Sequence, residues 1–197
     1  EEALKDSGGG ATPEPSQADI LTDLADDAEL FHSAEGTAFG DIRIDGHRET
    51  WPVRAKGFRR WLTQQFFDAT SGAPTSEALS SAINVIEAKA HFEGPELPVF
   101  IRVGGVEDKL YLDLCDETWN AVEVTSTGWR VVEEPPVRFR RAAGMLPLPE
   151  PKSGGSVGAF RSFLNVKSDN DLKKIIRATF STETQEGAQK FLENLIG

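Results

Sequence analysis

The apolar positions between Gly57 and Phe92 recur every three to four residues, which is the spacing of one helix face. Gly72 and Pro74 interrupt the pattern, and Thr75 or Ser76 can cap a second helix. The sequence therefore predicts two amphipathic helices, over 57–70 and 75–92, that pack as a helix hairpin. Their apolar stripes are Phe58, Trp61, Leu62 and Phe66, and Leu79, Ala82, Ile83, Ile86 and Ala90.

Helical spacing also begins at Asp19 and continues to Phe31, with Asp26 and Asp27 on the polar side. We expect Gly36 to stop this helix. Two alternating runs follow, over 38–44 and 49–53. They are separated by Asp45-Gly46, a dipeptide that tolerates the positive φ angles of a tight turn. This part of the sequence predicts one helix and then a β-hairpin.

The region after the helix hairpin has short runs with strand character over 98–103, 109–114, 120–125, 129–132 and 137–141. Turn signals separate them at Gly104-Gly105, Asp116-Glu117 and 126–128. Because strands and helices do not alternate regularly, we predict an α+β fold with a mostly antiparallel sheet. Two short apolar stripes predict a C-terminal helical tail: Leu172, Ile175 and Ile176, then Ala188, Phe191, Leu192 and Leu195.

These patterns divide the chain into four parts. We expect a disordered acidic tail over 1–18, an α+β globular domain over 19–144, a proline- and glycine-rich arm over 145–158, and a helical segment over 159–197. The arm is predicted from the proline spacing of Leu146 to Pro151, which forbids helix and favours an extended chain.

The net charge of −11 is unevenly spread along the chain. Residues 1–29 hold nine acids and one base, residues 30–150 hold eighteen and thirteen, and residues 151–197 hold five and seven. The N-terminal region is therefore expected to be a solvated acidic segment. A second interpretation is an autoinhibitory tail that competes for a basic surface.

No catalytic or metal-binding motif stands out. The single cysteine, Cys115, excludes an internal disulfide, and three scattered histidines lack ligand spacing. Asp113, Asp116 and Glu117 would hold Mg²⁺ only if they converged, and an acidic turn is the simpler interpretation. We expect no enzyme activity and no cofactor. The absence of a long apolar run or a basic leader predicts a soluble cytoplasmic protein with no membrane partner.

Two basic sets are the best candidates for binding. The first bridges the hairpin and the next helix, and the alternation of the second predicts that its charges face solvent while Phe139 faces inward. If both sets shared one face they could contact DNA or RNA, whereas a net charge of −5 over residues 30–150 favours ion pairs instead. The sets are Arg54, Lys56, Arg59 and Arg60, and Arg138, Arg140 and Arg141.

Several runs resemble the N-terminal region of large bacterial ATP-binding proteins of prophages, plasmids and other mobile elements, which are primase-like or helicase-like P-loop ATPases. The similar runs are GFRRWL (57–62), APTSEAL (73–79), YLDL (111–114), GWRVV (128–132), PPVRFRR (135–141), GMLPLPEP (144–151) and GGSVGAFRSFLNV (154–166).

In that family the region precedes a P-loop core that binds ATP. This chain has no G-x-x-x-x-G-K-[ST] motif, and Gly154-Gly155-Ser156 lacks the lysine that would reach a phosphate. The resemblance therefore implies a non-catalytic accessory module, whose P-loop ATPase partner would lie in the same chain or in another one. Its function would be nucleic-acid contact or, alternatively, protein interaction or oligomerisation. The sequence is expected to be either a truncated relative or an independent module.

Overall fold

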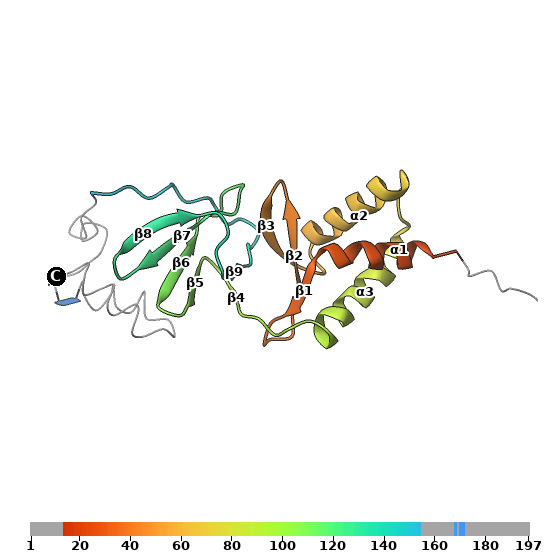
Figure 1. Ribbon diagram of the computed structural model, residues 1–197, viewed down its shortest axis with the longest axis horizontal. Helices are drawn as coiled ribbons and strands as arrows, with labels where there is room; N and C mark the ends of the chain where they lie inside the picture. The colour runs from red at the N-terminus through yellow and green to blue at the C-terminus, as the bar shows by residue number, and fades with distance from the viewer. Residues whose placement is uncertain (1–13, 155–167, 169, 172–197) are drawn as a thin grey trace, which may run out of the picture.

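The computed structural model describes residues 14–154, 168 and 170–171, and its fold is α+β, as predicted (Figure 1). Helices and a three-stranded sheet form the N-terminal half, and short strands form the C-terminal half. The N-terminal elements are α1 (Gln17–Leu24), a 3₁₀ turn (Ala25–Asp27), β1 (Glu29–His32), β2 (Ala38–Ile44), β3 (His47–Pro52), α2 (Lys56–Thr70) and α3 (Ser76–Phe92).

The β-hairpin is confirmed, and so are the two helices α2 and α3, but their expected packing on each other is wrong, because α1 lies between them and contacts both (Figure 1). Asp45 and Gly46 adopt φ angles of 48° and 86° in the turn between β2 and β3. The Thr75 hydroxyl accepts a hydrogen bond from the backbone of Ala78 and caps α3. Trp61 is half-buried beside Phe58 rather than enclosed between the helices, with ring centroids 5.2 Å apart.

The first predicted helix is wrong in its second half. The helix ends at Leu24, and the chain turns into strand β1, where Phe31 lies opposite Phe39 of β2 with the rings stacked 5.5 Å apart. Pairing with the next strand along the chain thus overrides the helical spacing of this segment. The predicted disordered tail is also too long, because α1 begins at Gln17 with a capping box between Ser16 and Asp19.

Strand β2 lies in the middle of its antiparallel sheet and is buried on both faces. Ala38 and Ile42 point to one face and pack with the helices around Phe58 and Ile83. The other face carries Asp41 toward the C-terminal half, where Arg138 meets it. The three-stranded sheet therefore lies between the helices and the C-terminal half (Figure 1).

The C-terminal half contains a four-stranded antiparallel sheet in the order β5-β6-β7-β8 and a parallel pair, β4-β9. A separate hydrophobic cluster, formed around Tyr111 and Phe139, holds the two together. The predicted Gly104-Gly105 turn is wrong, since both glycines lie inside β5 and the chain turns at 107–108 instead. The elements are β4 (Val99–Phe100), β5 (Val103–Val106), β6 (Lys109–Asp113), β7 (Ala121–Thr125), β8 (Gly128–Val132) and β9 (Arg138–Phe139).

Residues 145–152 contain neither helix nor strand. The backbone N–H of Leu148 donates to the carbonyl of Leu114 at 2.8 Å, so this stretch follows the end of the four-stranded sheet. The predicted helical segment 159–197 lies outside the described residues, apart from 168 and 170–171.

Candidate nucleic-acid interface

The first turns of α2 carry three basic side chains close together. Lys56, Arg59 and Arg60 follow Ala55, which caps the helix with no side-chain hydrogen bond, and the first turn contains no acidic residue. The N-terminus of a helix has a partial positive charge, so cations at this end are unfavourable for the isolated helix and favourable for an approaching anion. We call these three residues the α2 basic cluster.

No ion pair within the described residues involves the α2 basic cluster, whereas its neighbour Arg54 is paired. The Arg54 guanidinium donates to both carboxylate oxygens of Glu87 on α3, and to Asn84 Oδ1 at 3.1 Å. This pair lowers the pKa of the Glu87 carboxyl. Arg54 therefore joins α3 to the loop before α2, which leaves the three cluster residues as the positive charges of this surface.

A cavity of about 500 Å³ lies between α2 and the β2-β3 hairpin. Arg60, Trp51 and Trp61 are among the residues that line it. The Trp51 ring packs so closely on the backbone of α2 that a Cβ at Gly57 would overlap it. Glycine at position 57 thus allows an aromatic ring to lie beside the basic cluster.

A second hollow, of about 400 Å³, lies on the other side of Arg60. Arg59 and the exposed side chain of Phe67 also line it. Positive charges and aromatic rings therefore line both hollows, and the first also contains the carboxylates of Asp45 and Glu49, the latter accepting from Trp51 Nε1 at 2.6 Å. Basic and aromatic side chains together are the combination that single-stranded nucleic acids use for backbone contact and base stacking.

Arg138, in the second predicted basic set, is not exposed. Its Nε donates to Asp41 Oδ2 at 2.8 Å, its Nη2 donates to Glu29 Oε1 at 2.6 Å, and its guanidinium lies 4.9 Å from the Phe31 ring centroid. The side chain is 14% exposed and that of Asp41 is 3% exposed. The prediction that the strand alternation points its charges into solvent is therefore wrong for Arg138. Phe139 is buried, as predicted.

Asp41 receives further support from β3. The Thr50 hydroxyl donates to its Oδ1 at 2.6 Å, and Arg48 Nε lies 3.7 Å from its Oδ2. Burial raises the pKa of the Asp41 carboxyl, although the Thr50 hydrogen bond and the two arginines oppose the shift. Arg48 also donates to the carbonyl of Val137 at 3.0 Å. These contacts form an ionic junction between the two halves of the molecule.

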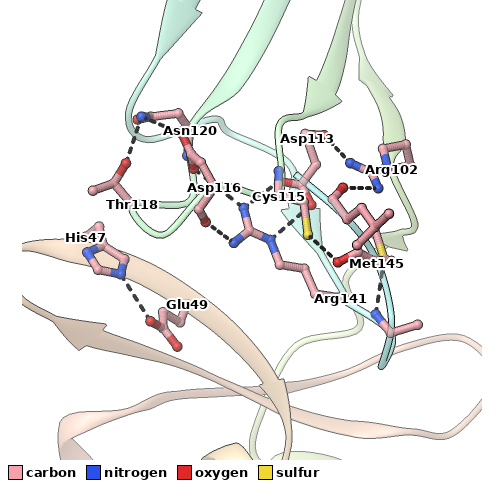
Figure 2. A network of polar contacts seen from close by, with 12 residues as sticks. His47, Glu49, Arg102, Asp113, Cys115, Asp116, Thr118, Asn120, Arg141 and Met145 are labelled. Atoms are coloured by element: carbon pink, nitrogen blue, oxygen red, sulfur yellow. Dashed lines mark hydrogen bonds and ion pairs between the residues drawn. The ribbon is translucent and has the colours of Figure 1, made fainter. Parts of the chain in front are cut away.

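Arg141 contacts both a carboxylate, which Figure 2 shows, and an aromatic ring. Its Nη2 and Nε donate to the two carboxylate oxygens of Asp113 at 2.6 and 3.1 Å, and its guanidinium lies 4.0 Å from the Trp119 ring centroid. The Asp113 side chain is almost fully buried, and its carboxylate is neutralised by the Arg141 guanidinium. Nothing in the described part of the chain forms a cluster of three or more His, Cys, Asp or Glu side chains able to hold a metal ion.

Trp119 connects the two halves and is a residue that sequence reasoning missed. Its ring meets Trp51 edge-on, with centroids 6.0 Å apart, so contacts run from the cavity beside α2 through Trp51 and Trp119 to Arg141. Its φ of 58° belongs to the turn between β6 and β7. The acidic residues before Asn120 predict a turn at this position, but they do not indicate that Trp119 contacts Trp51, which is far away in the sequence.

The remaining predicted residue, Arg140, is exposed. Its backbone N–H donates to the carbonyl of Phe100 at 2.8 Å, which continues the pairing of β4 with β9. The predicted sets are thus separated by role: Arg54, Arg138 and Arg141 are paired with carboxylates, and Lys56, Arg59, Arg60 and Arg140 form no ion pair with a described residue.

Comparison of the chain with protein-family models, with curated proteins and with solved structures found no match. Within the described residues, no helix is long and apolar enough to cross a lipid bilayer.

Proposed function

We propose that this chain is a non-catalytic accessory module that contacts nucleic acid through the α2 basic cluster. The observation that carries the proposal is the position of Lys56, Arg59 and Arg60. They lie at the positive end of a helix, without an ion pair to a described residue, beside a cavity lined by two tryptophans. The association with a mobile-element primase-like or helicase-like ATPase rests on the sequence resemblance.

Single-stranded nucleic acid suits this surface better than a duplex. Two half-buried tryptophan rings beside the basic cluster offer stacking surfaces for unpaired bases, and stacking tolerates any base sequence. A duplex keeps its bases stacked on one another, so it would use only the charges.

The acidic N-terminal region does not act as a free competitor over its whole length. Asp19 caps α1, Asp26 pairs with Lys89 at 2.9 Å, and Glu29 pairs with Arg138. Removing residues 1–29 would therefore delete α1 and the start of β1. An autoinhibition test must instead remove residues 1–13, whose net charge is −2.

The test is a titration of fluorescent oligo(dT) with the chain and with a matched pair of charge reversals. Arg60→Glu alters the basic cluster, and Lys152→Glu makes the same charge change at an exposed site beyond the sheet. Three contacted phosphates predict that log affinity falls with log salt with a slope of about −2. Arg60→Glu is expected to weaken binding and flatten the slope, with Lys152→Glu close to the parent.

Equal losses in both variants would mean that binding depends on net charge rather than on this site. No binding at low salt, by the chain with or without residues 1–13, would rule out the nucleic-acid function. The alternative of a protein-interaction module would then be favoured, with the exposed Phe67 beside the cluster as the first contact to test.

A further inference from the structure

The four-stranded sheet of the C-terminal half has one face made almost wholly of apolar side chains. The strand registers place Leu112, Val122 and Val131 side by side, and place Leu110, Val124 and Trp129 in the next row on the same face. We call this set the apolar sheet face. With the contribution of β5, it consists of Val103, Gly105, Leu110, Leu112, Val122, Val124, Trp129 and Val131.

The cluster that joins β4 and β9 to this sheet lies on the opposite face. Tyr111 and Ala121 alternate with the residues of the apolar sheet face, and they pack with Phe100 and Phe139. The Tyr111 hydroxyl donates to the Glu123 carboxylate at 2.8 Å on that side. The sheet therefore carries apolar side chains on both faces, which is the pattern of a central layer rather than of a sheet with one solvated face.

Exposure along the apolar sheet face is graded. Val122, in the middle, is 3% exposed, whereas Trp129 on the edge strand β8 is 42% exposed. Val103 on the opposite edge strand is 37% exposed, so apolar surface remains in water at both edges of this face, and soluble domains rarely leave a large contiguous apolar patch uncovered. The position of Trp129 marks where the edge of a cover would lie.

We propose that the C-terminal segment, residues 172–197, docks on the apolar sheet face and forms the third layer of the C-terminal half. Its 26 residues carry apolar side chains at helical spacing. The second stripe, from Ala188 to Leu195, would measure about 10 Å as a helix, and four strands span about 14 Å. A single helix of this segment would thus cover most of the width of the sheet.

The path of the chain favours its own C-terminus over a second molecule. Arg102 Nη2 donates to the carbonyl of Leu146 at 2.9 Å, and Leu148 is bonded to Leu114, so the chain leaves the folded part from the end of this sheet. In Figure 1 the stretch after β9 passes along the sheet beyond β8. A segment tethered this closely has an effective concentration in the millimolar range.

The first test places a nitroxide at Lys190→Cys in a Cys115→Ser background. Lys190 lies opposite the apolar stripe on a helical projection, so the label leaves the docking surface intact. Docking predicts that the label broadens the indole N–H signal of Trp129 and spares that of Trp61 in the N-terminal half. Absence of broadening at Trp129 would overturn the proposal.

A mixed sample distinguishes the chain's own C-terminus from that of a second copy. It contains spin-labelled chain without isotope enrichment and ¹⁵N-enriched chain without the spin label. Docking within one chain predicts no broadening of the Trp129 signal in this mixture. Broadening there would identify a second copy as the occupant and overturn the proposal.

The second test is limited trypsin digestion of the full chain. The segment contains four cleavage sites, so docking predicts slow cleavage there, and Trp129→Glu is expected to accelerate it about tenfold or more. The matched control is Phe92→Glu, at an exposed apolar residue in the N-terminal half, which is expected to leave the cleavage rate unchanged. Phe191→Glu should accelerate cleavage while the sheet sequence stays untouched. Equal cleavage of all three variants and the parent would overturn the proposal.

Discussion

Removing the Asp41 carboxylate is the most direct test of how the two halves of the molecule are joined. In Asp41→Ala, the Arg138 guanidinium, whose side chain is only 14% exposed, loses its buried partner. Breaking a buried pair on one side costs about 3–5 kcal/mol, because the remaining charge stays desolvated. At about 2–4 °C per kcal/mol for a chain of this size, the melting temperature should fall by about 6–20 °C.

A surface pair between the same halves provides the control. Arg43 and Glu134 have side chains that are 66% and 51% exposed, so Arg43→Ala should cost about 0–1 kcal/mol. Urea unfolding of Asp41→Ala, of Arg138→Met and of the double variant, each compared with the parent, gives the coupling energy of the pair, expected at about 0.5–3 kcal/mol. Urea unfolding of Arg43→Ala gives the control value. If Asp41→Ala costs no more than Arg43→Ala, the junction does not hold the halves together and the reasoning is refuted.

Two further predictions concern the two cores. Ile83→Ala should destabilise the fold by about 2–5 kcal/mol, because this side chain of α3 is buried in the N-terminal core. The control is Phe92→Ala, at the exposed end of α3, which should stay within about 0.5 kcal/mol of the parent. Equal urea midpoints for the two variants would contradict the burial of Ile83. Hydrogen bonds from Arg130 and then Tyr111 lower the pKa of Glu123 to about 2, so its stabilising effect is complete above the unfolded pKa of about 4.3 and is lost as the pH falls toward 2. Glu123→Gln should therefore flatten the acid limb of the stability curve, and parallel curves for variant and parent would count against it.

Elements whose signals are local could be predicted from the sequence. The β2-β3 turn depends on Asp45-Gly46 alone, and α2 and α3 depend on their own apolar stripes. Strand β1 could not be predicted because its apolar residues also have the spacing of a helix. What makes this segment a strand is its pairing with β2, which lies beyond a turn. The turn expected at Gly104 is wrong for a related reason: this glycine makes room for the Phe100 ring, which a Cβ at position 104 would approach to 2.6 Å.

The roles of the arginines could not be predicted in the same way. Arg138 and Asp41 are 97 residues apart, and Arg141 and Asp113 are 28 apart, so no sequence window contains both members of either pair. The α2 basic cluster differs because its environment is local. Its charges lie at the start of a helix that the apolar stripe already defines, and this surface could therefore be located from the sequence.

The net charge of the chain does not describe the environment of each cation, since the carboxylates are not distributed evenly around them. Glu29, Asp41 and Asp113 neutralise Arg138 and Arg141 at the junction and in the C-terminal half. Two carboxylates, Asp45 and Glu49, line the cavity beside Arg60, so the local field at the start of α2 is set by them as well as by the basic cluster. An excess of acids over the whole chain is thus compatible with a local anion-binding surface, and the salt slope of the Arg60→Glu variant measures that local field directly.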